Sequence, residues 1–351
     1  MKIAVLAPPF AAVPPTGQGG TERIAYEMCE GFTKRGHQVT LFAVGDSKIS
    51  GEFKQLYKIP ISARKFDTSQ VESSRGLRLE MAYIARVMDE LIKSSGEFDV
   101  IFNNLRGGYL LSFLHRVIKT PIINILHLPL FPEIAEIFSL LAEPNIVTIS
   151  NNQRQHFPQL KYLATVYNGI NPAEFKFCEQ ADDYFLFLGA IAEHKNPHEA
   201  ILACQKTGQK LILAGGKKRE PYFTKKIKPL VDGQQIKYIG EVFGKDRTEL
   251  LRRAKGFLFP IVWQEPFGLV MAEAMAGGTP VIAYHNGAVP EVVKDGQTGF
   301  VVKDVAGIVE AIKKINQIDR AACRQRVVDN FTVEKMIDGY EQVAQRVINK
   351  K

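Results

Sequence analysis

The sequence predicts an α/β protein with two Rossmann-like domains, each built on a doubly wound parallel sheet. Short apolar runs typical of buried strands alternate with helical segments along most of the chain, as in sheets whose parallel strands are joined by crossover helices. This alternation stops at a polar stretch, residues 179–183, and then begins again. The length of 351 residues gives each of two domains enough chain to bury its own core.

The first domain opens with a unit of strand, loop, helix and strand. Residues 3–7 are the first strand, and Gly19-Gly20 begins a helix that leads to a second strand at residues 38–44. In such a unit the loop before the helix faces a ligand. The dinucleotide-binding glycine pattern fits weakly, because Glu22 occupies its third glycine position, and this counts against a nicotinamide enzyme.

Polar residues follow two later strands of the first domain. After a long helix from Leu77, further strands are expected at residues 98–103, 121–126 and 145–149. His127 and Ser150 come directly after the second and third of these strands, at the sheet edge where parallel sheets bind ligands. A lone histidine in an apolar stretch is more often a core residue than a catalyst, but its placement favours a site for His127, with a weaker case for Ser150.

The second domain repeats the architecture without repeating the sequence. Its strands are expected at residues 184–188, 210–214, 236–239 and 256–260. The turn Asn168-Gly169-Ile170-Asn171-Pro172, together with the polar stretch, marks the crossing between the domains. The chain ends in a helix, residues 333–348, with a broad apolar face formed by Met336, Ile337, Tyr340, Val343 and Val347.

Residues 263–302 carry the most specific pattern of the chain, in the order loop, helix, tight turn, buried strand and helix. The free N–H groups and positive dipole end of the first helix favour an anion, and Gly268 allows a phosphate to approach the backbone. Glu265 lies just before this helix start and Glu273 within about two turns beyond it, so the two carboxylates would accept hydrogen bonds from hydroxyls on either side of a diphosphate. For either glutamate alone, a solvated charge at a helix end is the simpler interpretation.

This stretch resembles the nucleotide-sugar site of family 4 retaining glycosyltransferases, which have the two-domain GT-B fold. The shared motifs are Glu265-Pro266-Phe267-Gly268-Leu269, Glu273-Ala274-Met275-Ala276 and Gly278-Thr279-Pro280-Val281. The resemblance implies that Glu265 contacts the donor sugar, Glu273 the ribose, and the helix start the diphosphate. The catalytic residues that it implies are His127, Lys195 and Glu265. The donor-binding residues are Gly19, Gly20, Ser150, Asn168, Lys195, Pro266, Phe267, Gly268, Leu269 and Glu273.

One position departs from the family pattern. The family has Gly-Arg…Lys after the first strand of the second domain, and the two cations clamp the diphosphate. Here Gly189-Ala190 is followed by Lys195, so the lysine is present and the arginine is missing. Losing one charge-assisted phosphate contact costs about 1.5–3 kcal/mol. His194 and the basic cluster at residues 217–219 are the candidates to supply the missing cation.

Composition excludes several other function classes. No apolar run reaches the roughly 18 residues of a spanning helix. The four cysteines show no C-x-x-C spacing, so neither a disulfide framework nor a zinc site is indicated, and a reducing cytoplasmic location is expected. The net charge of +8 is spread over both halves, which suits phosphate-bearing substrates or peripheral contact with the inner face of an anionic membrane. It is too diffuse for a nucleic-acid footprint.

The implied reaction is the retaining transfer of a sugar from a nucleotide-diphosphate donor to a hydroxyl of a glycan, lipid-linked or small-molecule acceptor. UDP-sugar is the first expectation for the donor and GDP-sugar the second. No cofactor is expected, and the absence of an Asp-x-Asp motif disfavours the metal-dependent type of glycosyltransferase. A nucleotide-sugar epimerase of similar fold and a sugar-nucleotide-binding protein with weakened catalysis are the alternatives, the second because of Ala190.

The domain limits follow from these interpretations. Residues 1–172 are expected to form the acceptor-side domain and residues 173–330 the nucleotide-sugar domain. By analogy with GT-B proteins, residues 331–351 are expected to form a helix that crosses back to the first domain. Three segments of the first domain, residues 10–18, 45–75 and 103–110, are expected to select the acceptor, whose identity they do not disclose.

Overall fold

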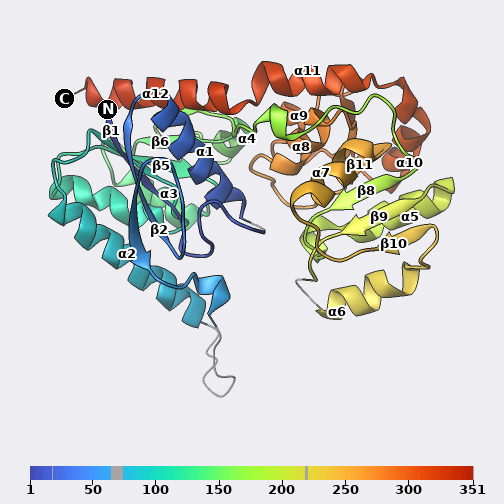
Figure 1. Ribbon diagram of the computed structural model, residues 1–351, viewed down its shortest axis with the longest axis horizontal. Coiled ribbons are helices and arrows are strands. Elements are labelled where there is room, and N and C mark those ends of the chain that lie inside the picture. The colour runs from blue at the N-terminus through green and yellow to red at the C-terminus, as the bar shows by residue number, and fades with distance from the viewer. Residues whose placement is uncertain (18, 65–73, 218–219, 351) are drawn as a thin grey trace. The chain divides into compact units, whose positions relative to one another are not determined.

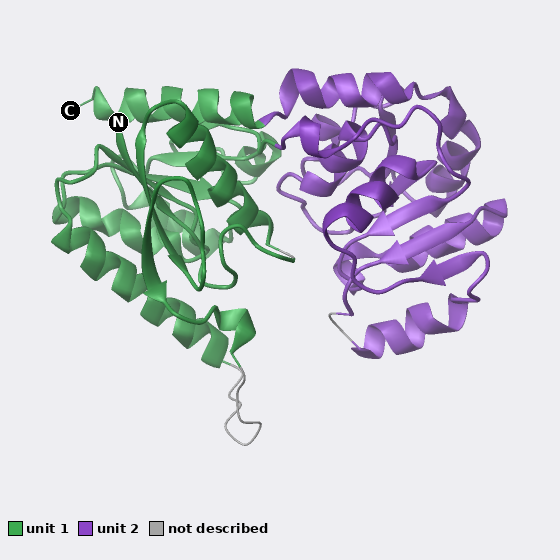
Figure 2. Cartoon of the chain, in the orientation of Figure 1, with its two compact units in different colours: residues 1–169, 333–351 green, residues 170–332 purple. Residues whose placement is uncertain are grey.

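The computed structural model describes residues 1–17, 19–64, 74–217 and 220–350 and divides into two compact units (Figure 2). Unit 1 comprises Met1–Gly169 and Val333–Lys351, and unit 2 comprises Ile170–Thr332. The chain therefore passes from unit 1 to unit 2 within the Asn168–Pro172 turn. In unit 2, Ile170 forms a β-bridge with Thr332, and its N–H donates to the carbonyl of Phe331 at 2.9 Å. Parts of two expected acceptor-selecting segments, residues 18 and 65–73, lie outside the described residues.

The described strands of unit 1 form one parallel sheet in the order β3-β2-β1-β4-β5-β6-β7 (Figure 1). The strands are β1 (Lys2–Leu6), β2 (Gln38–Val44), β3 (Glu52–Tyr57), β4 (Val100–Asn103), β5 (Ile122–Leu126), β6 (Ile146–Thr148) and β7 (Tyr162–Thr165). The order reverses between β1 and β4, which makes this position the topological switch point. The sequence did not indicate β3 or β7, and these are the two edge strands.

Helices surround this sheet. They are α1 (Gly20–Lys34), α2 (Arg75–Lys93), α3 (Pro132–Ser139), α4 (Asn152–Gln155) and α12 (Val333–Ile348), with the 3-10 segments η1 (Ile61–Ala63) and η3 (Gly108–Arg116). The five residues of the expected apolar face of α12 are all buried. A Cβ on Gly31 of α1 would stand 2.5 Å from Ile337 Cγ1, so α1 and α12 pack closely, and the Tyr340 ring lies 5.6 Å from that of Phe102. The C-terminal helix is thus part of the core of unit 1.

Unit 2 contains a second parallel sheet, in the order β10-β9-β8-β11-β12-β13 across its described strands. These are β8 (Phe185–Leu188), β9 (Leu211–Ala214), β10 (Ile236–Tyr238), β11 (Gly256–Phe259), β12 (Val281–Tyr284) and β13 (Gly299–Val302). The main helices are α5 (Pro197–Thr207), α7 (Gly244–Arg253), α8 (Leu269–Ala276), α9 (Val289–Val292), α10 (Val305–Lys314) and α11 (Arg320–Asn330). Short helical turns are η4 (Pro172–Glu174), η5 (Glu193–Lys195), α6 (Glu220–Tyr222), η6 (Phe223–Ile227), η7 (Lys228–Leu230) and η8 (Ile315–Gln317). The switch point lies between β8 and β11. The prediction of two doubly wound parallel sheets is confirmed.

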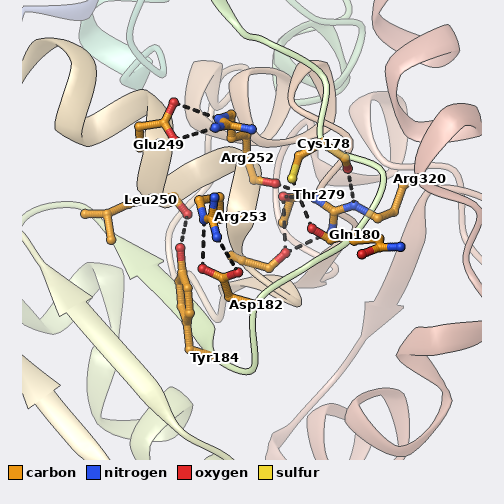
Figure 3. Close-up of polar contacts among 11 residues, drawn as sticks. Cys178, Gln180, Asp182, Tyr184, Glu249, Leu250, Arg252, Arg253, Thr279 and Arg320 are labelled. Atoms are coloured by element: carbon orange, nitrogen blue, oxygen red, sulfur yellow. Dashed lines mark hydrogen bonds and ion pairs between the residues drawn. The ribbon is translucent and has the colours of Figure 1, made fainter.

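Arginines fasten the segment that leads into β8 to the body of unit 2 (Figure 3). The Arg320 guanidinium donates to the carbonyls of Cys178 at 2.7 Å and Ala254 at 2.9 Å, and Arg253 binds both carboxylate oxygens of Asp182 at 2.8 Å. A pocket of about 700 Å³ lies beside this segment. Its walls include Pro280 and Lys255, which precede β12 and β11, so it lies at the amino edge of the sheet. The ligand-binding edge of a parallel sheet is the opposite one.

Candidate functional site

Three loops of unit 2 bring the most specific sequence residues to the carboxyl edge of its sheet. Lys195 follows β8, Glu265 follows β11, and Gly287 follows β12. Since β8 and β11 flank the switch point, Lys195 and Glu265 come from the two strands between which open α/β sheets bind ligands. The loops therefore form a candidate site at the position that the topology favours.

The carboxylate of Glu265 is held by two donors that both contact Oε2. Lys195 Nζ lies 2.9 Å from this oxygen, and the indole Nε1 of Trp263 lies 3.0 Å from it. The Lys195 and Glu265 side chains are only 20% and 12% exposed, so water screens this ion pair weakly. Both residues belong to the expected donor site, and their ion pair places a cation and a hydrogen-bond acceptor side by side.

The backbone of Glu265 is held as firmly as its side chain. Its carbonyl accepts the N–H of Ala288 at 2.8 Å. Gly287, at φ +59°, approaches so closely that a Cβ there would stand 2.3 Å from both the nitrogen and the oxygen of Glu265. A glycine is therefore required at position 287 both for its backbone conformation and for space.

Lys195 lies among aromatic rings. Its ammonium is 5.0 Å from the centroid of the Trp263 ring and 5.5 Å from that of Phe259, both within cation–π range. The neighbouring His194, one candidate for the missing cation, packs edge-on against Trp263 with the ring centroids 5.7 Å apart. For the other candidate, Lys217 is exposed with its ammonium 4.2 Å from the Phe223 ring, and Lys218 and Arg219 lie outside the described residues.

The helix that follows Glu265 begins at Leu269. This is slightly later than Pro266 suggests, since proline favours the first turn of a helix. Pro266 and Phe267 lie in the loop before it, and the Phe267 ring packs against Phe331 at 5.5 Å. Gly268 is the N-cap residue, at φ +82°, and in this fully described part of unit 2 no side chain caps the helix start. The first backbone N–H groups of α8 therefore have no side-chain acceptor at the position where the sequence led us to expect a backbone anion site.

The second glutamate of the motif has a partner that sequence reasoning missed. Glu273 is 2% exposed, and its carboxylate forms an ion pair with Arg247 of α7. Arg247 is one of four cations in α7, and the sequence contains no signal that distinguishes it from the other three. Any ribose hydroxyl that contacts Glu273 therefore shares this carboxylate with a guanidinium.

In unit 1, His127 lies at the carboxyl end of β5, as the sequence indicated. It is half-buried, and its Nε2 lies 2.8 Å from Oδ1 of Asn104, the residue after β4. Burial lowers the pKa of His127 to about 4, so the imidazole is neutral at pH 7. Gln153 of α4 holds the surrounding strand ends, since it donates to the Leu126 carbonyl at 2.9 Å and accepts the N–H of Ile149 at 2.8 Å.

Three buried polar atoms at the same edge lack hydrogen-bond partners among the residues that the structure describes. They are Asn104 Nδ2, Ser150 Oγ and Asn168 Oδ1. Ser150 and Asn168 follow β6 and β7, so these atoms belong to loops after neighbouring strands. Leaving such a group unpaired costs about 1–3 kcal/mol, and a hydroxyl-rich ligand could supply the partners.

The Gly19-Gly20 turn of unit 1 lies beside a carboxylate. Gly19 is the N-cap residue of α1, and a Cβ on it would stand 3.1 Å from Glu22 Oε2 and 2.9 Å from Pro15 Cβ. Glu22 is buried, and this burial raises the pKa of its carboxyl, with an opposing contribution from its own backbone N–H. The carboxyl group of Glu22 therefore lies directly beside the glycine turn that is expected to bind the donor.

The described residues contain neither a metal-binding cluster nor a membrane-spanning helix. Residues 1–17, 19–64, 74–217 and 220–350 contain no group of three or more His, Cys, Asp or Glu side chains that could hold a metal ion. Over the same ranges, every helix is too short or too polar to cross a membrane.

Family models match both units. The model described as Glycosyltransferase Family 4 matches residues 18–174, and the one described as Glycosyl transferases group 1 matches residues 174–327. Phosphatidyl-myo-inositol mannosyltransferase of Mycobacterium leprae is 26% identical over 356 residues, which cover 93% of this chain and 90% of that protein.

Two further proteins are similar to this chain, one over about half of its length and one over nearly all of it. Glycogen synthase of Mycobacterium tuberculosis is 28% identical over 203 residues, and because these cover 53% of this chain and 49% of that protein, the match spans about half the length of this relative. Anabaena HepE, solved in complex with UDP and glucose, matches 99% of this chain and 100% of its own with a TM-score of 0.73 at 17% identity.

Proposed function

This chain belongs to the group 1 glycosyltransferases of family 4 and has the GT-B fold, and we propose that it transfers a sugar, with retention and without a metal, from a nucleoside-diphosphate sugar to a hydroxyl group. UDP is the proposed nucleotide, and GDP is the alternative. The binding of UDP and glucose by the structural neighbour HepE supports a UDP-sugar. The acceptor is a glycan, a lipid-linked sugar or a small molecule with a free hydroxyl.

The ion pair of Lys195 and Glu265 at the switch point of the unit 2 sheet is the observation that carries this proposal. Glu265 lies in the loop that leads to the start of α8, which no side chain caps. A cation and a helix start are suited to a diphosphate, and a carboxylate held next to them is suited to a sugar hydroxyl. We propose that Lys195, Gly268 and Leu269 bind the diphosphate, that Glu265 binds the sugar, and that Glu273 binds the ribose beside Arg247.

The chemical step needs stabilisation of the leaving diphosphate and delivery of the acceptor hydroxyl to the same face of the sugar. Lys195 and the α8 amides stabilise the charge that develops on the leaving phosphate, which takes the acceptor proton. The neutral imidazole of His127 and the unpaired polar atoms near it are suited to hydrogen bonds with sugar hydroxyls. We propose that this reaction uses no hydrolase-type pair of carboxylates.

A thermal-shift panel of UDP-, GDP- and ADP-sugars tests the donor site. One nucleotide should raise the melting temperature of the wild type, and Lys195→Met should lose most of that shift because it removes the cation of the site. Lys210→Met is the matched control, since Lys210 is an exposed lysine that pairs with Asp183 before β8. Equal shifts in both variants would contradict the assignment of Lys195.

Turnover of the stabilising donor then separates the alternatives. Slow hydrolysis to free sugar and nucleoside diphosphate supports a transferase that lacks its acceptor. Release of an isomerised sugar indicates an epimerase, and binding without turnover indicates a binding protein, as the missing arginine at position 190 would favour. If no nucleotide sugar stabilises the wild type, the proposed function is wrong.

A further inference from the structure

We propose that Trp263 is a positioning residue of the donor site, which holds Glu265 so that only one of its two carboxylate oxygens is presented to the sugar. This inference rests on the proposed function. Glu265 lies in a loop, between the end of β11 and the start of α8. Without additional contacts, its side chain would rotate freely and lose conformational entropy when a sugar binds.

The two donors on Glu265 set the orientation of the carboxylate. Both the Trp263 indole N–H, at 3.0 Å, and the Lys195 ammonium, at 2.9 Å, contact Oε2. Oε1 accepts no hydrogen bond from any residue that the structure describes. Oε1 is therefore the oxygen that remains for a ligand, and Trp263 and Lys195 together fix where it points.

Trp263 also contacts Lys195 directly, so each of the side chains of Trp263, Lys195 and Glu265 contacts the other two. The ring face of the indole lies 5.0 Å from the Lys195 ammonium while its N–H is directed at Glu265. One side chain thus contacts both members of the ion pair through two different parts of its ring. A phenylalanine at this position would keep the ring face and lose the N–H.

The N–H matters most when a donor is bound. An arriving diphosphate competes with Glu265 for the Lys195 ammonium, because both are anions in reach of the same cation. As the ammonium turns to the phosphate, the indole N–H remains as the donor that keeps Glu265 in place. Loss of this N–H should therefore weaken binding of the sugar portion and leave binding of the nucleotide portion nearly unchanged.

Calorimetry of UDP and UDP-glucose with wild type, Trp263→Phe and Trp263→His tests this separation. Trp263→Phe should bind UDP within about threefold of wild type and bind UDP-glucose about tenfold or more weakly, the range for a lost hydrogen bond to a charged group. Trp263→His retains a ring N–H and should recover part of the loss. Equal losses for both ligands would indicate a merely structural role and would overturn the proposal, as would unchanged affinity for UDP-glucose.

A second measurement does not depend on any ligand. Trp263 is the single tryptophan of the chain, so all tryptophan emission comes from this site. Glu265→Gln should shift the emission maximum, because the indole N–H loses a charged acceptor, whereas the remote control Asp183→Asn should not. An emission maximum unchanged in Glu265→Gln would overturn the contact even if the wild type binds UDP. If the wild type binds no nucleotide but the shift is seen, the contact stands, while the proposed function and the positioning role fail together.

Discussion

Arg247 of α7 and Glu273 of α8 form an ion pair in which the carboxylate is almost completely buried. Removing one partner of a buried pair leaves an uncompensated charge, which typically costs about 3–5 kcal/mol. We therefore expect Arg247→Met to lower the free energy of unfolding of unit 2 by about this amount. Chemical denaturation followed by circular dichroism would measure it.

The double variant Arg247→Met/Glu273→Met is the control for this prediction. Replacing both charges with apolar side chains of similar volume is often close to neutral for stability, so the double variant should recover much of the loss. A double variant as unstable as Arg247→Met would show that packing, and not the unpaired carboxylate, causes the effect. The same pair explains why Glu273→Ala alone is a poor test of ribose binding, since it also releases Arg247.

The pH dependence of stability should reveal the environment of His127. Its pKa of about 4 in the folded protein lies below the ordinary value of 6.5, so the unfolded chain takes up a proton first as the pH falls. This histidine therefore lowers stability progressively between pH 6.5 and pH 4, by up to about 1.4 kcal/mol per pH unit. Unfolding of wild type and His127→Gln over this range should show a smaller slope for the variant, and parallel curves would contradict the assignment.

Asn104→Asp gives a sharper version of the same test. A carboxylate in place of the amide that contacts His127 Nε2 should favour the imidazolium and raise the pKa of His127. NMR titration of the ring protons would measure this change directly. Asn104→Ala should leave the pKa of His127 low, because burial remains its main cause.

The sheets were predictable because buried parallel strands are short continuous apolar runs, and here nearly all of them are. β3 was missed because polar residues interrupt its sequence, Glu-Phe-Lys-Gln-Leu-Tyr, so it contains no continuous apolar run, as suits an edge strand. β7, Tyr-Leu-Ala-Thr, is only four residues long, and all its residues are half-buried. Strands of this kind lack the contrast between core and surface on which the pattern depends.

The candidate site was predictable only as far as its motif extends. Glu265, Gly268 and Glu273 lie within a few residues of one another, so local spacing identified them together. Asn104 and Arg247 reach their partners through the fold, from strands and helices that the sequence does not order. The contact of the Trp263 N–H with Glu265 depends on a loop conformation, which propensity and spacing do not specify.

Two glycines at positive φ should respond very differently to the same substitution. Gly296, at φ +70°, has nothing within 4 Å of an added Cβ, so Gly296→Ala should cost only the about 1–2 kcal/mol of left-handed backbone strain. Gly287→Ala carries that strain and also places the Cβ 2.3 Å from the backbone of Glu265. It should be the more destabilising variant and should weaken donor binding, whereas Gly296→Ala should not. Similar denaturation midpoints for the two variants would contradict the packing argument.

The missing arginine can be restored at Ala190, which is half-buried directly after β8 and precedes the loop that carries Lys195. A guanidinium here would add a second cation to a site that has Lys195 and the α8 backbone. We expect Ala190→Arg to tighten UDP binding by about 10–100-fold, corresponding to about 1.5–3 kcal/mol for a hydrogen bond to a charged group. Calorimetry at two salt concentrations would measure both the gain and its electrostatic origin.

Ala190→Met is the matched control, because it adds similar length without charge. If both variants bind UDP like the wild type, position 190 does not face the diphosphate. The role that the family pattern gives to an arginine at this position then does not apply to this chain. If both bind it more weakly, the added bulk obstructs the site. If only the arginine variant binds UDP more tightly, the fold can accommodate one more cation at this site than the wild type has. If that gain is lost at high salt, it is electrostatic, because salt screens the added ion pair.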